Sequence, residues 1–420
     1  MKHYSLTKFS IGIIAISLLW SCQQDTQWKG QEPIQRVSTL TKPIQLQLKK
    51  TFDLGDGIYC SNEFDGARLN GIVLSNDTLI TALITPENTP INGSPWYAFK
   101  LWSKSEKNMY LKLTYLEGVS HRYYPKLSRD GINWDNLDST NFFTDTTGIA
   151  NGASPKSISM KLSLSEDTLW VAAQELITSQ HIYKWEQELA KKPYISIHKI
   201  GESREGRPLN ILKIGNSNDQ KMILVLSRQH PPEVTGYLAM KAFVEKLSED
   251  QSLNQKFREK YKTFVIPLLN PDGVDLGHWR HNAGGIDLNR DWETFNQPEI
   301  AAVKAFMENK VKGSGGKFYF GVDFHSTFHD IYYTINPELK GNMPGLVPEL
   351  ITEMGKEFPD YQPNIRPGGL DGPKISSTSF MFYTFGAEAV TFELGDNTPR
   401  PFIKQKGEVA AQKLMEIMVK

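Results

Sequence analysis

The pattern of apolar and polar positions divides most of the chain into two regions of different character. The first region, residues 42–175, contains short apolar runs of strand length separated by Asp-Gly and Asn-Gly pairs, which favour tight turns. One of these runs alternates apolar and polar residues with a period of two. The runs lie at 44–48, 96–102, 109–115 and 168–173. This pattern predicts an all-β sandwich domain over residues 42–175.

The second region, residues 182–420, alternates dense apolar strands with helical periodicity. The expected strands are 222–227, 263–269, 318–324 and 389–394, and the expected helices are 182–189, 233–247, 298–309, 346–358 and 408–419. Strands that are apolar throughout are typical of a sheet buried on both faces. We therefore expect an α/β domain with helices on both faces of its sheet. Ligands in such sheets bind beyond the carboxyl ends of the strands.

The N-terminus carries a separate signal. Two lysines flank an apolar run at residues 9–20, which is shorter than the ~20 residues needed to cross a bilayer and fits the core of a signal peptide. Residues 19–21, directly before Cys22, resemble the processing site of bacterial lipoproteins. The resemblance implies that residues 1–21 are removed and that Cys22 becomes a lipid anchor. An ordinary secretory signal with an incidental cysteine is the alternative.

Polar, Gln-rich residues 22–41 are then expected to form a tether. On this interpretation the protein is lipid-anchored in the bacterial cell envelope, at the periplasmic face or the cell surface. The only other cysteine, Cys60, is expected to be buried and inert.

Composition narrows the possible classes of protein. The chain has 420 residues, of which 39% are hydrophobic, and only two cysteines, which excludes a disordered chain and a disulfide scaffold. The 47 basic residues balance the 47 acidic ones. A net charge of zero gives no reason to expect nucleic acid as a partner. The sequence leaves the oligomeric state open.

Four residues with metal and acid–base chemistry lie at the ends of the predicted strands. His230 and Glu233 follow the strand at 222–227, and a spacing of three residues lets both side chains point to one place. His325 ends a second strand. Two imidazoles and one carboxylate form the three-ligand set of a catalytic zinc, which leaves a position for water. Glu393 ends a third strand, where a carboxylate can accept a proton from that water.

The surrounding motifs strengthen this interpretation. Asn-Pro-Asp-Gly-Val stands at 270–274, Gly-His-Trp-Arg at 277–280, Gly-Ile-Asp-Leu-Asn-Arg-Asp-Trp at 285–292, and Gly-Glu-Ser-Arg-Glu-Gly-Arg-Pro-Leu at 201–209. Together with the His-x-x-Glu pair, His325 and Glu393, in this order, residues 182–420 resemble the zinc carboxypeptidases, metallopeptidase family M14. The resemblance is closest to the cytosolic-carboxypeptidase-like subgroup and its bacterial relatives. It implies a mixed sheet with helices on both faces, preceded here by the β-sandwich.

The resemblance also implies how the metal is held. His230, Glu233 and His325 would bind one zinc ion. Asp287 would accept a hydrogen bond from His230 and thereby fix which ring nitrogen faces the metal.

The remaining matches imply how a substrate is bound and cleaved. Glu393 would act as general base and then general acid. Arg280 would polarise the scissile carbonyl and stabilise the oxyanion. Asn289 and Arg290 would hold the C-terminal carboxylate of a peptide, with Arg290 binding it as a fork. We therefore expect a zinc-dependent metallocarboxypeptidase.

One departure from the family pattern keeps alternatives open. The family has a tyrosine on a mobile loop before the catalytic glutamate, but residues 367–376 contain none. Tyr383 is the next tyrosine after this segment and is expected to lie in the core. An amidase acting on cell-wall peptides is a second candidate, and a binding lipoprotein without activity is a third.

Overall fold

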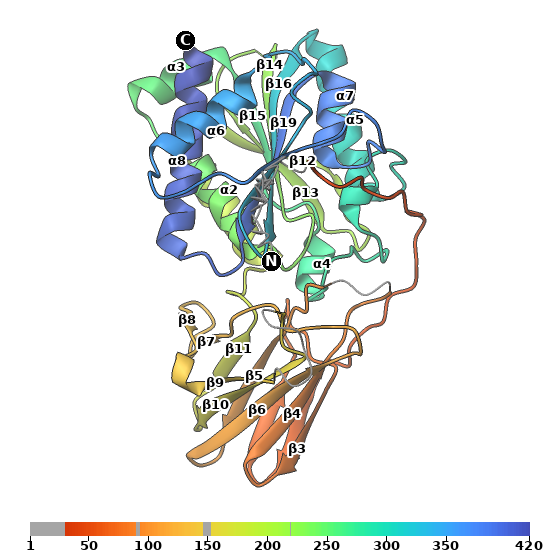
Figure 1. The fold of residues 1–420 in the computed structure, drawn as a ribbon, viewed down its shortest axis with the longest axis vertical. Helices are drawn as coiled ribbons and strands as arrows, with labels where there is room; N and C mark the ends of the chain where they lie inside the picture. Colours follow the sequence, from red (N-terminus) through yellow and green to blue (C-terminus); the bar gives the residue numbers. More distant parts are fainter. Residues whose placement is uncertain (1–29, 90–92, 146–152, 219) are drawn as a thin grey trace, which may run out of the picture.

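The computed structural model describes residues 30–89, 93–145, 153–218 and 220–420. The predicted signal segment and Cys22 lie outside these residues. Two regions are distinct in Figure 1: an all-β region, called here the front region, and a larger α/β region. Within the described ranges, no helix is both long enough and apolar enough to cross a membrane.

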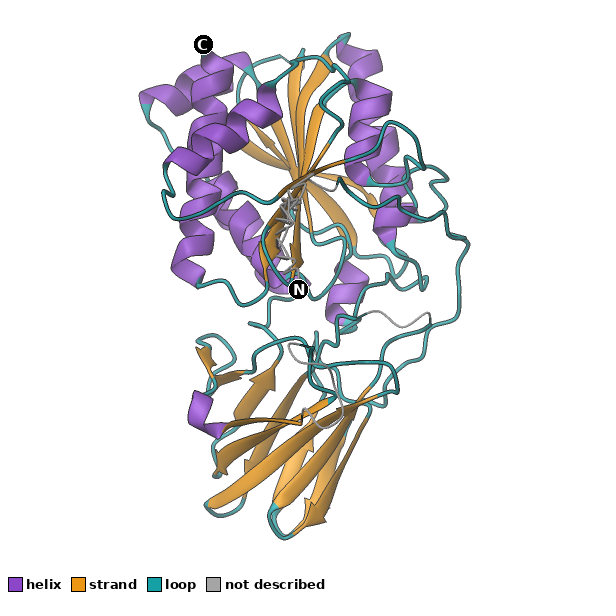
Figure 2. Ribbon diagram, in the orientation of Figure 1, coloured by secondary structure: helices purple, strands orange, loops and turns teal. Residues whose placement is uncertain are grey.

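The front region is a sandwich of two sheets (Figure 2). One sheet has the order β1-β2-β5-β11-β7-β8 and the other β3-β4-β6-β10-β9. The strands are β1 Thr51–Gly55, β2 Ile58–Ser61, β3 Gly71–Asn76, β4 Leu79–Ile84, β5 Ala98–Ser103, β6 Lys107–Tyr115, β7 Lys126–Ser128, β8 Asp135–Asn136, β9 Phe142–Asp145, β10 Ser157–Leu164 and β11 Leu169–Ala172; a short 3-10 helix, η1 Ser139–Asn141, precedes β9. Apolar side chains from both sheets fill the space between them, and Cys60 is buried there.

The expected strand at 44–48 is wrong. These residues lie outside any strand, although their alternation is real. Near the end of this run it is the polar Gln47 that faces the protein: it donates to the carbonyl of Ala67 at 2.6 Å and accepts from the N–H of Leu69 at 2.9 Å. Leu46 and Leu48 are 68% and 66% exposed. A period of two indicates an extended chain, but it does not decide which side is buried.

Residues 30–48, called here the strap, run along the α/β region before reaching β1 (Figure 1). The N–H of Gln31 donates to the carbonyl of Pro367 at 2.7 Å. Arg36 forms a two-pronged ion pair with Glu293, at 2.7 and 2.8 Å. In its described part, the segment expected to be a tether is therefore in contact with the α/β region.

The α/β region is built on one mixed sheet of eight strands in the order β12-β13-β15-β14-β16-β19-β17-β18. Its strands are β12 Ile195–Glu202, β13 Pro208–Ile214, β14 Lys221–Ser227, β15 Lys262–Ile266, β16 Lys317–Thr327, β17 Ile331–Thr334, β18 Ile365–Pro367 and β19 Glu388–Gly395. Its helices are α1 Ser179–Leu189, α2 Val234–Leu247, α3 Ser252–Lys260, α4 Pro271–Asp275, α5 Pro298–Ser314, α6 Leu346–Lys356, α7 Ser377–Phe385 and α8 Arg400–Val419, with the 3-10 turn η2 Leu288–Arg290. The mixed sheet with helices on both faces is as predicted, whereas the helices α3, α4 and α7 were not predicted.

Strand β14 explains why the sheet needs helices on both faces. Met222, Leu224 and Leu226 pack in the cluster that contains α5 and α7, whereas Ile223 and Val225 pack in the cluster that contains α2, α6 and α8. Figure 2 shows these two groups of helices on opposite sides of the sheet. The central strands β14, β16 and β19 are parallel, so their carboxyl ends meet at one edge. The candidate site residues predicted from the sequence lie at this edge.

Candidate active site

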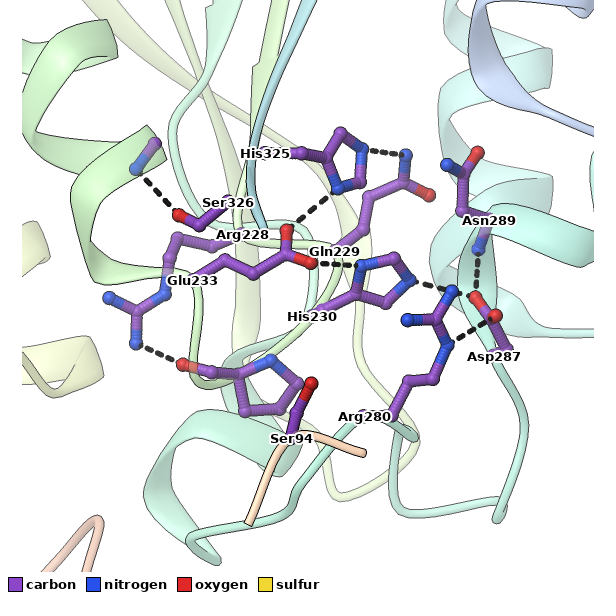
Figure 3. Close-up of polar contacts among 12 residues, drawn as sticks. Ser94, Arg228, Gln229, His230, Glu233, Arg280, Asp287, Asn289, His325 and Ser326 are labelled. Atoms are coloured by element: carbon purple, nitrogen blue, oxygen red, sulfur yellow. Dashed lines mark hydrogen bonds and ion pairs between the residues drawn. The ribbon is translucent and has the colours of Figure 1, made fainter. Parts of the chain in front are cut away.

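Three candidate metal ligands come together beyond strands β14 and β16. The chain leaves β14 through Arg228, whose φ of 54° gives a sharp turn, and Glu233 caps the start of α2. His325 lies near the end of β16. Their ligand atoms all lie within 4.8 Å of one another, and all three residues are buried. In Figure 3 the carboxylate of Glu233 lies between the two imidazoles.

Close packing of α2 on β16 fixes this arrangement. A Cβ added to Gly236 would lie 2.5 Å from the carbonyl oxygen of His325, so only glycine lets the helix approach so closely. The hydroxyl of Ser326 accepts from the N–H of Gly236 at 2.8 Å. The first turn of α2, which follows Glu233 directly, is thus held against the strand that carries His325.

Each histidine presents one ring nitrogen to the site and keeps the other on a carboxylate. The Nδ1 atoms of His230 and His325 lie 2.8 and 2.7 Å from the Glu233 carboxylate. On the far side of each ring, Nε2 of His230 lies 2.9 Å from Asp287, and Nε2 of His325 lies 2.9 Å from Asp323. Carboxylates in this position orient histidine ligands of zinc. The donor set and its outer partners therefore fit a zinc ion.

Arg280 reaches the same cluster through Asp287. Its Nε donates to the second carboxylate oxygen of Asp287 at 2.6 Å (Figure 3). Burial alone would raise the pKa of Asp287, but Arg280, His230 and Arg290 outweigh it and hold that pKa well below its usual range. A carboxylate thus links a candidate metal-ligand histidine to a partly exposed arginine.

The two residues expected to bind a substrate carboxylate, Asn289 and Arg290, lie within η2. The N–H of Asn289 donates to Asp287 at 2.8 Å, and its side-chain oxygen accepts from the N–H of Ser377 at 3.0 Å. The guanidinium of Arg290 lies 3.9 Å from Asp287 and donates to the carbonyl of Asn289 at 2.8 Å. These contacts leave the amide nitrogen of Asn289 as the end that can donate to a ligand.

Glu393 stands beside His325 in the sheet, because the two residues are partners in the β16–β19 pairing. Its Oε2 atom is buried without a hydrogen-bond partner among the described residues. Burial raises the pKa of Glu393 to about 8, with Glu233 adding to the rise and His325, Arg122 and Arg280 opposing it. A carboxylate with a buried oxygen that has no partner, at the strand position paired with a candidate metal ligand, is typical of a group that transfers protons.

The structure adds residues at the site that the sequence reasoning missed. Asp323 accepts from Gln229 at 2.5 Å and also from the hydroxyl of Ser377. Asp323 lies two residues before His325 in the same strand. Because alternate residues of a strand point to the same face, the sequence could have indicated that Asp323 and His325 share a face. Arg122 comes from the front region and donates to Asp396 at 2.7 Å and to the carbonyl of Ser326 at 3.3 Å. No local pattern marks Arg122.

Tyr383 is not a core residue, contrary to expectation. It lies on α7 and is 43% exposed. It lines a small cavity together with Tyr333, Thr378 and Lys374, and the ammonium of Lys374 lies 4.6 Å from its ring centre. The helical period of α7 turns this position away from the sheet, whereas Phe382, the residue directly before it, is buried.

Comparison with known proteins agrees with this geometry. Residues 182–343 match a family model described as zinc carboxypeptidase. Cytosolic carboxypeptidase 6 of Caenorhabditis elegans is 32% identical over 152 residues, which cover 34% of this chain and 33% of that protein. An uncharacterised protein of Zymomonas mobilis is 32% identical over 124 residues, covering 29% and 32%. The chain thus matches about a third of the length of these relatives.

Solved structures share the fold over a greater length. A metallo-carboxypeptidase from Burkholderia cenocepacia superimposes with a TM-score of 0.70 at 17% identity, covering 86% of this chain and 98% of that one. A metallo-carboxypeptidase from Pseudomonas aeruginosa, in complex with (2-guanidinoethylmercapto)succinic acid, gives 0.68 at 20% identity, covering 86% and 98%. The β region and the α/β region therefore occur together in known structures. Residues 182–343 therefore match the zinc carboxypeptidase domain of peptidase family M14.

Proposed function

We propose that this protein is a zinc-dependent metallocarboxypeptidase that removes C-terminal residues from peptides. The observation that carries the proposal is the meeting of His230, Glu233 and His325 with Glu393 at the carboxyl ends of adjacent strands. Three ligands of this type leave a coordination position for water. The unpartnered carboxylate of Glu393 is placed beside them.

Different residues of the site have different roles in the proposed reaction. Zinc bound there would lower the pKa of a water molecule to about 7 and polarise the scissile carbonyl. Glu393 takes the proton from the attacking water and passes it to the departing amine. Arg280 carries a fixed positive charge next to the candidate metal ligands, where it would stabilise the negative charge that develops on the carbonyl oxygen.

Asn289 and Arg290, which follow Asp287, orient the substrate. Arg290 offers a planar fork that matches a carboxylate. The amide nitrogen of Asn289 adds a second donor, because its oxygen is already bound to Ser377. A peptide whose terminal carboxylate binds here places its last peptide bond toward the metal ligands, which favours release of single C-terminal residues.

Cleavage of cell-wall peptides by the same chemistry is the second candidate. Residues 367–376 contain no tyrosine to cap a terminal carboxylate, and this absence favours a substrate recognised differently. An envelope location would supply such a substrate. We propose that location on the basis of the N-terminal signal and Cys22. Labelling cells with a fatty-acid analogue tests it: wild type should carry the label and Cys22→Ala should not.

A direct experiment separates the candidates. Residues 23–420 are incubated with a mixed L-peptide library and, separately, with cell-wall peptides, with and without a zinc chelator, and the products are read by mass spectrometry. Chelator-sensitive loss of single C-terminal residues supports the carboxypeptidase. Cleavage of wall peptides alone supports the amidase. A zinc-loaded protein that cleaves neither is a binding protein and overturns both.

A further inference from the structure

The segment that carries Arg280 is held by the front region. Glu87 follows β4 and is completely buried. Its carboxylate accepts three consecutive backbone N–H groups: Trp279 at 2.7 Å, Arg280 at 3.1 Å and His281 at 2.7 Å. The residues on the two sides of this contact are 192 to 194 positions apart in the sequence. One side chain of the front region thus fixes the backbone on both sides of the arginine.

The surroundings of the buried Glu87 carboxylate favour its charged form. Burial alone raises its pKa, but the ring of His281, whose Nδ1 lies 2.9 Å from the carboxylate, and the nearby His278 and Arg68 outweigh that effect and hold the pKa well below its usual range. Hydrogen bonds to an ionised acceptor are about twice as strong as neutral ones. The three N–H contacts therefore form a firm clamp.

A second set of contacts anchors the same segment independently. Trp279 is completely buried and belongs to the apolar core of the front region, where its indole N–H donates to the carbonyl of Trp96 at 3.1 Å. A Cβ added to Gly277 would lie 2.2 Å from the carbonyl oxygen of Ala67, so the two backbones touch. The residue directly before Arg280 is thus part of the core of the front region.

The backbone held by Glu87 is directly connected to the candidate active site. Arg280 extends from the clamped backbone and donates to Asp287 at 2.6 Å, and Asp287 contacts the ring of His230 (Figure 3). A displacement of about 1 Å in a catalytic group can cost about a hundredfold in rate. The position of the guanidinium therefore depends on a carboxylate in the front region.

We propose that Glu87 is a positioning residue for catalysis, acting through Arg280, and that the front region is thereby part of the catalytic apparatus. The inference rests on the proposed function, in which Arg280 stabilises the oxyanion. The hydrogen bonds of Glu87 go to the backbone of residues 279–281 and not to the candidate metal ligands. It sets the backbone of residues 279–281, so its loss should affect the transition state more than substrate or zinc binding.

Kinetics of Glu87→Gln test the proposal. Glutamine keeps one acceptor oxygen but turns an NH2 group toward backbone N–H donors. We expect kcat to fall about tenfold to a hundredfold with zinc content and KM unchanged. Glu106→Gln, an exposed carboxylate of the same region, is the matched control and should behave as wild type. Full kcat in folded Glu87→Gln overturns the proposal.

A double-mutant cycle shows whether the effect passes through Arg280. Arg280→Ala should lower kcat by about 10² to 10³. If Glu87 acts through that arginine, Glu87→Gln should change kcat less than about threefold in the Arg280→Ala background. Losses that multiply in the double variant mean that Glu87 acts elsewhere, and they overturn the proposal.

Hydrogen exchange provides a readout that does not depend on activity. The amides of residues 279–281 should be protected in wild type and should exchange at least tenfold faster in Glu87→Gln, while β16 is unaffected. If Glu87→Gln does not fold, Glu87→Asp, which draws the carboxylate back by one methylene, takes its place. Unchanged exchange at 279–281 overturns the inference. A wild type that is inactive but protected at these amides overturns the proposed function and leaves the clamp supported.

Discussion

The Nε2 atom of His230 lies 2.9 Å from Oδ1 of Asp287. The other oxygen of the same carboxylate accepts from Arg280 at 2.6 Å. One buried, charged side chain therefore orients both a candidate metal ligand and the candidate oxyanion-binding arginine. Substitution of Asp287 should disturb both functions at once.

Asp287→Asn should weaken zinc binding by about 10–100-fold and lower turnover even at saturating zinc. An asparagine that accepts from His230 turns its NH2 group toward Arg280, which also donates. Competition with a chromophoric chelator measures the zinc affinity. Asp360→Asn, at an exposed position, is the control. Wild-type zinc affinity in Asp287→Asn would show that His230 needs no carboxylate partner.

Glu393→Gln should bind zinc normally but lose activity by at least about 10²-fold, because the amide cannot accept the proton of the attacking water. Zinc content is read by elemental analysis and activity by release of C-terminal residues. Glu388→Gln, at the other end of β19, should retain most activity. An active Glu393→Gln would remove this residue from the mechanism.

Zinc should stabilise the fold as well as support activity. A ligand present at 100 times its dissociation constant adds about 2.7 kcal/mol to the free energy of unfolding, so the melting temperature of chelator-treated protein should rise on adding zinc. Magnesium, which prefers oxygen ligands, should have little effect. His325→Ala should abolish the zinc response. A melting temperature that zinc leaves unchanged in wild type would argue against the three-ligand site.

Arg122→Met should destabilise the protein by about 3–5 kcal/mol, because it leaves Asp396 as a buried charge without its partner. The two side chains are only 9% and 3% exposed. Adding Asp396→Asn should restore part of the loss. Arg129→Met, at an exposed site, should cost far less. Denaturant unfolding measures each value, and equal losses at Arg122 and Arg129 would contradict the prediction.

Glu186 should make stability fall as pH rises. Burial raises its pKa to about 7, while a hydrogen bond from Asn210 partly opposes the rise. Between its unfolded pKa near 4.5 and its folded value, the folded state binds more protons, so stability declines across this interval, by on the order of 3 kcal/mol in total. Glu186→Gln should remove the decline and be more stable than wild type at pH 8. Glu188→Gln, exposed on the same helix, should keep the wild-type slope.

The local patterns of the α/β region were sufficient to place its main elements. Expected strands such as 222–227 and helices such as 233–247 agree with β14 and α2, because a strand covered on both faces is apolar throughout and a helix repeats its buried positions every three to four residues. The same holds for His230 and Glu233, which share one turn. The strand at 44–48 and the position of Tyr383 were wrong for a common reason: periodicity shows which residues share a face, but not what covers that face.

The sequence by itself determined the two-region organisation, the metal-type ligand set and the order of the motifs around it, because these depend on short spacings and on strands that end at one edge. Only the tertiary structure decided that Glu87 clamps the Arg280 segment and that Arg122 reaches Asp396. A single acidic or basic residue in a loop carries no local sign of its partner. Its role depends on burial and on contacts across the whole chain, and packing alone creates both.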